Sequence, residues 1–220
     1  MNGQPVYCIS GLGADEKIFS KLSLNGYELK HLPWLRPGRK ETIQEYAKRM
    51  AAAIKDEAPV MMGVSFGGMV AIEIAKQLPL SKLILVSSVK SSKELPRWMR
   101  MSGMLLLNKI LPIRSYKFTE KIDNSRLGVS NEEEKAMAAY YRKKADPVYL
   151  QWAVDQVLNW NNEWFPEHTV HIHGNKDRIF PLKKLEVHHV IEDGTHFMIY
   201  NRAADISRIL LMELESRWTK

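Results

Sequence analysis

A serine flanked by glycines most constrains what this chain can fold into. The sequence Gly-Val-Ser-Phe-Gly, with Ser65 at its centre, follows the apolar run 59–62 and precedes the apolar segment 69–75. A buried parallel strand, a tight turn and a buried helix explain these three pieces. Glycine has a low helix propensity, so its presence at two positions of the first helical turn needs a reason. Gly67 and Gly68 therefore indicate close packing against a neighbouring strand. Such a turn lifts the serine hydroxyl clear of the sheet edge, which makes Ser65 a candidate nucleophile.

Alternating strand and helix patterns surround this turn. Strands are predicted at residues 5–9, 27–32, 59–62, 82–87, 169–173 and 186–191. Residues 42–54 and 204–218 carry apolar side chains at helical spacing. The alternation predicts an α/β fold with a mostly parallel sheet of about six strands and helices on both faces. The glycine motif alone is also compatible with a turn in an ordinary α/β domain.

The alternation stops after the fourth predicted strand, where helical patterns replace it. Capping signals at Ser130 and at Asp146 predict the starts of two of these helices. We therefore expect residues 91–165 to form a helical cap, inserted before the last two strands and lying over the carboxyl edge of the sheet. Residues 1–90 and 166–220 are expected to form the core.

Composition is that of one ordinary globular domain. The chain has 220 residues, of which 45% are hydrophobic and 26% charged, enough to bury a sizeable core. No stretch resembles a signal peptide, and no apolar run approaches the roughly 20 residues that span a bilayer. The single Cys8 cannot form an internal disulfide, so a cytoplasmic location is expected.

A formal net charge of +7 has two interpretations. The basic residues are either scattered over solvated helix surfaces or produce a field that attracts anionic substrates. No zinc-finger spacing, dinucleotide-binding glycine pattern or phosphate-binding loop accompanies them. Nucleic acid is therefore not an expected partner.

A serine nucleophile needs a general base and a carboxylate that orients the base. After a nucleophile turn of this kind, an acid and then a histidine are expected, each following a later strand. Asp177 lies on the loop after the predicted strand 169–173, and His196 lies on the loop after 186–191. Order and placement both fit the set Ser65, Asp177 and His196. Other carboxylates that are alternatives to Asp177 are Asp155, Asp193 and Asp205.

With three motifs in this order, the chain resembles a small, capped member of the α/β-hydrolase superfamily over nearly its whole length. The resemblance implies a reduced sheet that begins at the family's third strand. It also implies Ser65 as nucleophile, His196 as general acid and base, and Asp177 as the orienting carboxylate.

The same resemblance implies an oxyanion hole made of two backbone N–H groups. One belongs to Phe66, directly after the nucleophile, and the other to Leu12, in the loop after the first strand. That loop departs from the family pattern, because Ser10 stands where a histidine is common. A simple glycine-containing turn is the alternative interpretation of this loop.

The expected activity is hydrolysis of a small carboxylic ester or thioester through an acyl-enzyme, with no metal or cofactor and a small-molecule acyl substrate as partner. A serine at the turn argues against dehalogenase and epoxide-hydrolase chemistry, which uses a carboxylate nucleophile in this superfamily. One alternative keeps the same residues for carbon–carbon bond hydrolysis, amide hydrolysis or acyl transfer. An alternative of another class is a catalytically silent ligand-binding or sensor protein on the same scaffold.

Two further sets of residues have open interpretations. The predicted helix 95–111 carries apolar side chains that either line an acyl pocket or pack the cap onto the core. These are Trp98, Met99, Met101 and Met104. His171 and His173 alternate along a strand and, with Asp177, resemble part of a metal-binding pattern. Because no third clustered ligand follows, core histidines are favoured over a metal site.

Overall fold

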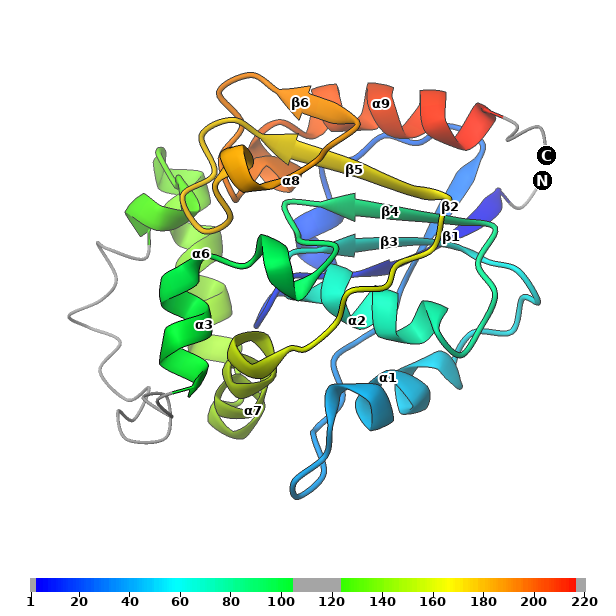
Figure 1. Cartoon of the computed structure of the whole chain (residues 1–220). Helices are drawn as coiled ribbons and strands as arrows, with labels where there is room; N and C mark the ends of the chain where they lie inside the picture. Colours follow the sequence, from blue (N-terminus) through cyan, green and yellow to red (C-terminus); the bar gives the residue numbers. More distant parts are fainter. Residues whose placement is uncertain (1–2, 105–123, 217–220) are drawn as a thin grey trace.

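Six parallel strands form one sheet in the computed structural model, which describes residues 3–104 and 124–216 (Figure 1). The order across the sheet is β2-β1-β3-β4-β5-β6. The strands are β1 Gln4–Ile9, β2 Tyr27–His31, β3 Val60–Val64, β4 Lys82–Val86, β5 Thr169–Gly174 and β6 His189–Ile191. The predicted fold class, with a parallel sheet of six strands, is confirmed.

The last strand is shorter than the predicted range 186–191. In place of a regular ladder bond, the side chain of His188 accepts the backbone N–H of His171 through Nδ1 at 3.1 Å. The backbone N–H of His188 donates to the carbonyl of His171 at 2.9 Å. Regular pairing with β5 therefore begins one residue later, at His189, opposite Ile172.

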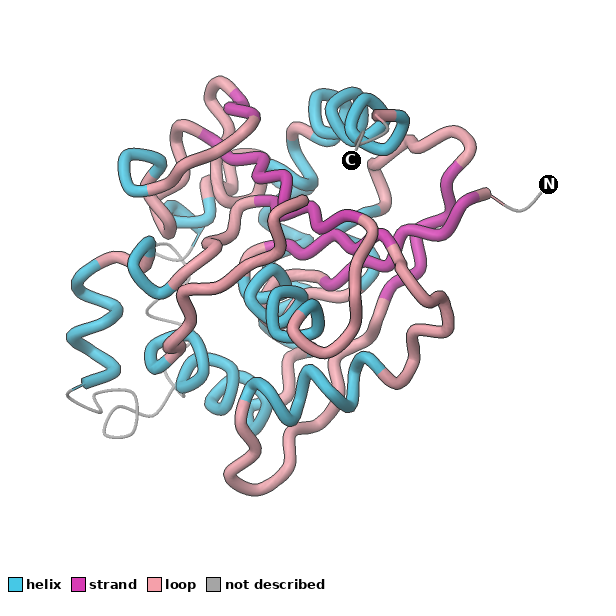
Figure 2. The backbone as a smooth tube through the Cα atoms, turned by 45° about the vertical axis from the view of Figure 1, so that its right-hand side comes forward, coloured by secondary structure: helices cyan, strands magenta, loops and turns pink. Residues whose placement is uncertain are grey.

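Helices cover both faces of the sheet, and each face has its own hydrophobic cluster (Figures 1 and 2). The first face packs against α1 Ile43–Ala51, α2 Phe66–Ala75 and α7 Pro147–Asn159. The second packs against the 3-10 helix η1 Glu16–Phe19 and against α6 Glu132–Lys144, α8 Met198–Asn201 and α9 Ala203–Glu215.

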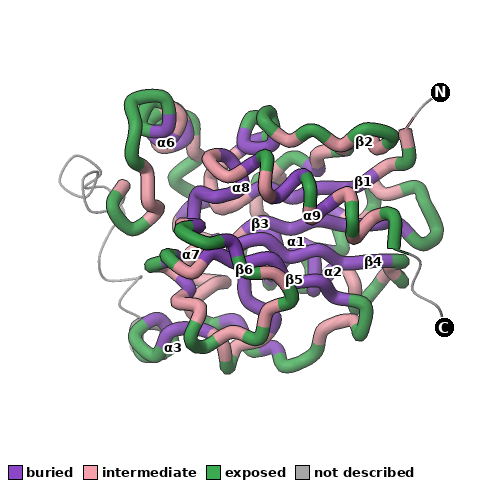
Figure 3. Tube along the Cα trace, turned by 90° about the horizontal axis from the view of Figure 1, so that it is seen from above, coloured by how far each residue is buried: buried purple, intermediate pink, exposed green. Residues whose placement is uncertain are grey.

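The two clusters follow the alternation of side chains along each strand. Sheet residues of the first cluster are Tyr7, Ile9, Met61, Leu83 and Leu85. Sheet residues of the second include Val6, Cys8, Met62, Ile84 and Ile172. A sheet that is buried on both faces has few polar side chains. Strands β3, β4 and β5 are buried along their whole length at the centre of the molecule, whereas the edge strands β2 and β6 are partly exposed (Figure 3).

A helical segment separates β4 from β5, as the sequence predicts. Its described elements are the 3-10 helix η2 Ser92–Glu94 and the helices α3 Arg97–Met104, α6 and α7. The rest of the predicted helix 95–111 lies outside the described residues. The strand arrows in Figure 1 point toward the side of the molecule where α3, α6 and α7 lie. These helices therefore gather near the carboxyl ends of the strands.

Local capping explains where these helices begin. Asn131, one residue after the predicted Ser130, caps α6 by accepting the backbone N–H of Glu134 at 2.9 Å. Asp146 accepts the backbone N–H of Val148 at 2.8 Å ahead of a proline at the first helical position, as the sequence predicts for α7.

The described residues contain no helix that is both long and apolar enough to cross a membrane. The single cysteine, Cys8, is buried in β1, and burial raises the pKa of its thiol to about 12. This thiol is therefore protonated at neutral pH and unreactive.

Helix α2 is buried from Phe66 to Ile74, including the carboxylate of Glu73. Trp160, directly after α7, donates its indole N–H to Glu73 at 2.8 Å, and Lys76 contacts the same carboxylate at 2.9 Å. The charge is thus paired and hydrogen bonded inside the protein, which buried charges require. This contact joins the end of the inserted segment to the central helix.

The first turn of α2 packs directly on backbone atoms of the sheet. A Cβ atom at Gly67 would lie 2.5 Å from the carbonyl oxygen of Ile9 and would also overlap the carbonyl of Ser10. A Cβ at Gly68 would lie 2.7 Å from the Cβ of Ser88. Both distances are shorter than any normal contact between a Cβ and another heavy atom. The two glycines therefore permit the close packing that the sequence predicts at this turn.

We predict that Gly67→Ala lowers the free energy of unfolding by about 1–3 kcal/mol, because backbone carbonyls cannot move aside as a flexible side chain can. Gly38→Ala is the matched control. Its Cβ would lie no closer than 3.4 Å to Glu41 in an exposed loop, and a change within about 0.5 kcal/mol is expected. Urea denaturation of both variants measures the difference, and equal midpoints would contradict this account of α2 packing.

Candidate active site

Ser65 occupies a strained turn between β3 and α2. Its backbone has φ 52° and ψ −121°, in the region that residues other than glycine rarely adopt. Three hydrogen bonds hold this conformation. Ser65 donates its N–H to the carbonyl of Val86 at 3.0 Å, and its own carbonyl accepts from Gly68 N–H at 2.9 Å and from the Ser88 hydroxyl at 2.7 Å. The surrounding backbone therefore determines where the hydroxyl lies.

The structure brings Ser65, His196 and Asp177 together. His196 Nε2 lies 2.9 Å from Ser65 Oγ, and His196 Nδ1 lies 2.7 Å from Asp177 Oδ2. The serine is partly exposed, whereas the histidine and the aspartate are buried. Because the carboxylate only accepts, Nδ1 carries the ring proton, and Nε2 is free to accept the proton of the serine hydroxyl.

The other carboxylates considered as alternatives lie in other surroundings. Asp205 pairs with Arg202 at 2.9 Å on α9. Asp155 accepts the side-chain amide of Asn159 at 3.1 Å on the surface of α7. Asp193 is exposed in the turn after β6, with φ 56°. Of the four carboxylates, Asp177 is therefore the one that hydrogen bonds to His196.

Asp177 keeps its charge although it is buried. Burial raises the pKa of this carboxyl, but the electrostatic interaction with His196 and hydrogen bonds from His173 and His196 outweigh burial and hold the pKa well below its usual range. Its second oxygen, Oδ1, accepts the backbone N–H groups of Ile179 at 2.8 Å and Phe180 at 2.9 Å. The turn after β5 is thus built around an ionised carboxylate.

The loop after β1 lies beside the nucleophile. A Cβ atom at Gly11 would lie 3.6 Å from Ser65 Cβ, an ordinary contact distance. Ser10, which replaces the histidine of the family pattern, is buried and donates its hydroxyl to the carbonyl of Ala14 at 2.7 Å. Leu12 lies between Ser10 and Ala14 in the sequence. The hydrogen bond from Ser10 to Ala14 therefore closes the loop that holds this expected oxyanion donor.

An aromatic cluster joins this loop to the inserted helices, and sequence analysis did not identify it. Trp34 donates its indole N–H to the carbonyl of Gly11 at 3.2 Å and stacks on Phe66 with ring centroids 5.5 Å apart. Tyr149 of α7 lies against Trp34 with centroids 5.2 Å apart, and Trp152 meets the edge of Phe66 at 6.0 Å. The spacing of Tyr149 and Trp152 predicts a shared helix face but not its partner.

The loop that carries His196 packs against residues 124–129. Phe197 donates its N–H to the carbonyl of Leu127 at 3.0 Å. Gly128 has φ +76°, and a Cβ there would overlap the side chain of Thr195. No local pattern indicates this contact, because the two segments are far apart in the sequence.

The candidate pocket residues of α3 lie in different surroundings. Met99 is buried in the first hydrophobic cluster. Trp98 and Met101 are 53% and 59% exposed, respectively. The side chain of Met104 lies outside the described residues. Their role in an acyl pocket stays a prediction.

His171 and His173 are both buried and lie on the same face of β5. Their rings meet at 87° with centroids 5.3 Å apart. In residues 3–104 and 124–216, no three histidine, cysteine, aspartate or glutamate side chains are grouped so that they could hold a metal ion.

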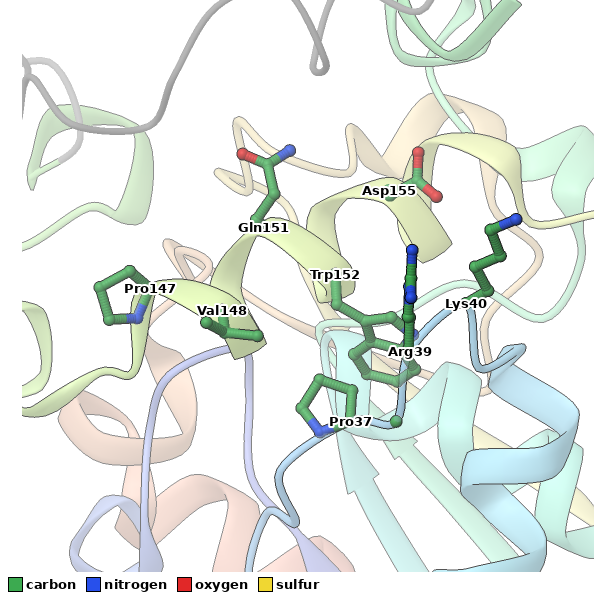
Figure 4. A pocket seen from close by; sticks show the side chains of 9 residues that line it. Pro37, Arg39, Lys40, Pro147, Val148, Gln151, Trp152 and Asp155 are labelled. Atoms are coloured by element: carbon green, nitrogen blue, oxygen red, sulfur yellow. The ribbon is translucent and has the colours of Figure 1, made fainter.

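A separate hollow of about 530 Å³ lies between the loop 37–40 and α7 (Figure 4). Trp152 projects from the helix toward the loop, and Arg39 and Lys40 lie along the opposite side. None of Ser65, Asp177 and His196 lines this hollow.

The sequence matches no protein-family model and no curated relative. Solved structures are similar over nearly the whole chain. MenH from S. aureus is 17% identical with a TM-score of 0.76, over 98% of this chain and 94% of that chain. A thermophilic esterase from Thermogutta terrifontis is 15% identical with a TM-score of 0.68, over 97% and 90%.

A protein from Burkholderia ambifaria described as having an α/β-hydrolase fold is 12% identical with a TM-score of 0.72, over 96% of this chain and 91% of that chain. These likenesses establish the fold. The expectation drawn from the sequence motifs, that the chain has the α/β-hydrolase fold, is confirmed.

We predict that burial of His171 lowers the free energy of unfolding as the pH decreases. Burial lowers the pKa of His171 from 6.5 to about 3. Between these pH values the unfolded chain binds a proton at His171 that the folded chain does not. The contribution of this residue to the free energy of unfolding is therefore complete above about pH 6.5 and decreases toward pH 3 by about 1.4 kcal/mol per pH unit. The pH dependence of urea unfolding should therefore be shallower by this amount in His171→Phe, and an unchanged slope would contradict the prediction.

Proposed function

We propose that this α/β-hydrolase-fold chain is a serine hydrolase that cleaves a small carboxylic ester or thioester through an acyl-enzyme. The observation that carries the proposal is the continuous pair of hydrogen bonds from Asp177 through His196 to Ser65, at 2.7 and 2.9 Å. This arrangement activates a hydroxyl that is too weakly acidic to attack alone. An esterase among the fold neighbours also supports the proposal.

In the first half of the reaction, Ser65 Oγ attacks the carbonyl carbon while His196 Nε2 takes the hydroxyl proton. Asp177 stabilises the resulting imidazolium, since its charge lies 2.7 Å from Nδ1. The C–O or C–S bond of the tetrahedral intermediate then breaks, and His196 gives its proton to the leaving alcohol or thiol. The acyl group remains esterified to Ser65.

In the second half, His196 takes a proton from water, which attacks the acyl carbon. The intermediate collapses, the bond to Ser65 Oγ breaks, and His196 returns the proton to the serine. A carboxylic acid leaves and the resting enzyme is restored. The water supplies the only atoms that are added, so the cycle is balanced without a cofactor.

The negative oxygen formed in both halves needs hydrogen-bond donors. We assign this role to the backbone N–H groups of Phe66 and Leu12. Phe66 is the first residue of α2, where backbone N–H groups have no partner within the helix and the helix dipole favours negative charge. The closeness of this loop to Ser65, where a Cβ added at Gly11 would lie 3.6 Å from Ser65 Cβ, supports the placement of the second donor.

Helices α3, α6 and α7 fit the role of a cap. Tyr149 of α7 contacts Trp34, whose indole N–H donates to the carbonyl of Gly11 in the loop after β1. The contact of Phe197 with Leu127 places residues 124–129 beside the histidine loop. These two contacts support our proposal that the inserted segment acts as a cap that selects substrates.

We predict that a fluorophosphonate probe labels the wild-type protein and that Ser65→Ala abolishes labelling, because the probe bonds to the activated serine oxygen. Mass spectrometry of the labelled peptide identifies the site. Ser81→Ala, at an exposed serine just before β4, is the control and should be labelled like the wild type. Equal labelling of wild type and Ser65→Ala would remove Ser65 from the role.

The leaving-group class is tested with a matched panel of ester, thioester, amide and β-diketone substrates, each assayed with wild type and Ser65→Ala. Turnover of esters or thioesters that is lost in the variant supports the proposal. Turnover of the diketone alone indicates carbon–carbon bond hydrolysis by the same residues. Binding without any turnover favours a ligand-binding protein.

We predict that Asp177→Asn lowers kcat by about 10⁴-fold, because an amide offers His196 Nδ1 a donor and favours the wrong tautomer. Asp193→Asn, in the exposed turn after β6, is the matched control and should retain most activity. Steady-state kinetics on the best ester substrate provide the measurement. A near-normal kcat for Asp177→Asn would transfer the orienting role to another group.

A further inference from the structure

His173 is a second histidine at the proposed acid. It lies at the penultimate position of β5 and is completely buried. Its Nε2 is 2.8 Å from the carbonyl oxygen of Phe180 and 3.3 Å from Asp177 Oδ2. That carboxylate oxygen is also the one that accepts from His196 Nδ1.

The Phe180 contact assigns the proton of His173. A carbonyl oxygen only accepts, so Nε2 must carry the hydrogen. The positive end of the N–H dipole is therefore directed at the end of the turn and lies close to Asp177 Oδ2. The other ring nitrogen, Nδ1, is buried and has no hydrogen-bond partner in the described part of the chain.

His173 thus connects both ends of the turn that presents the carboxylate. Asp177 Oδ1 accepts from Ile179 and Phe180, which closes the turn from inside. The bond from His173 to the Phe180 carbonyl ties the same turn back to β5. Rotation of the carboxylate about its last bond would move Oδ2 away from both histidines at once.

We propose that His173 is a positioning residue that holds Asp177 Oδ2 in line with His196 and shares its negative charge. The proposal rests on the proposed hydrolase function, in which Asp177 orients His196. It explains why a polar ring occupies a completely buried position of β5, where an apolar side chain would otherwise fit. The hydrogen bond from His173 also lowers the pKa of Asp177, in agreement with this geometry.

Three titratable side chains of the described residues lie close to the ring of His173. Asp177 and His196 lie on the two loops at the sheet edge, and His171 meets its ring from the same strand. Lys90, in the loop after β4, contributes positive charge near His171 and lowers its pKa further. In the described part of the chain, no hydrogen bond or ion pair joins His171 to Asp177, so His171 offers a control of equal burial on the same face of the strand.

The test compares His173→Phe, which removes the donor, with His173→Gln, whose amide nitrogen can replace Nε2. We expect His173→Phe to lower kcat by about 10- to 100-fold with KM changed less than about twofold, since misplacement of a catalytic group costs this much. The acid limb of the kcat/KM profile should move to higher pH, because Oδ2 then holds more charge against the imidazolium. His173→Gln should restore most of kcat, and His171→Phe should leave kcat and the profile unchanged.

A readout without turnover uses Ser65→Ala protein. With ¹⁵N-labelled histidine, NMR should show His173 as the Nε2–H tautomer, and the downfield Nδ1–H signal of His196 should shift in His173→Phe. Circular dichroism checks that each variant is folded, and the tautomer of His173, which is read without any substitution at that position, keeps the test valid if the phenylalanine variant is not.

The outcomes separate the two proposals. A His173→Phe protein with wild-type kcat and pH profile, or an Nδ1–H tautomer at His173, overturns the positioning role and leaves the hydrolase proposal intact. Hydrolysis that persists in Ser65→Ala overturns the hydrolase proposal. The tautomer and the His196 signal then still decide whether His173 holds Asp177.

Discussion

The close approach of α2 to the sheet is the constraint on which the rest of the structure depends. Gly67 lies against the carbonyl of Ile9, and Gly68 lies against Ser88. Only backbones without side chains fit at this distance, so the end of β1, the start of α2 and the loop after β4 converge on one point. That point is the turn holding Ser65, and the strained φ of this residue is a consequence of the packing around it.

A second constraint is the burial of charge. Asp177 is an ionised group in a buried turn, and such a group is tolerated only when donors surround it. Here the donors are two backbone N–H groups of its own turn and two histidine rings from different parts of the sheet edge. The same contacts that make the carboxylate stable inside the protein also aim one of its oxygens at His196. Stability and the proposed chemistry therefore have a common origin at this position.

Topology explains why much of the site was predictable from the sequence. Parallel strands end at the same edge of a sheet, so Ser65, Asp177 and His196, each following a strand, had to lie near one another. Capping residues such as Asp146 act within a few residues, and they located the inserted helices for the same reason. These signals act over a few residues, and the parallel sheet brings the residues that follow its strands together at one edge.

The unpredicted features all depend on contacts across long sequence separations. Alternation along β5 indicates which face His173 occupies, but it does not indicate that the Phe180 carbonyl lies there. Trp34 and Tyr149 are distant in sequence, and nothing local predicts that their rings meet. The short final strand follows from the side chain of His188, which takes the place of a backbone acceptor. Such details are set by packing after the topology is formed.

The contact between Gly128 and Thr195 has a consequence for how the protein can be altered. Residues 124–129 come from the inserted segment, yet they support the loop that carries His196 through the bond between Phe197 and Leu127. The insertion therefore does not behave as a removable module. Replacing it with the corresponding segment of another α/β-hydrolase-fold protein would remove one wall of the histidine loop, and a functional chimaera would have to carry residues 124–129 of this chain across the junction.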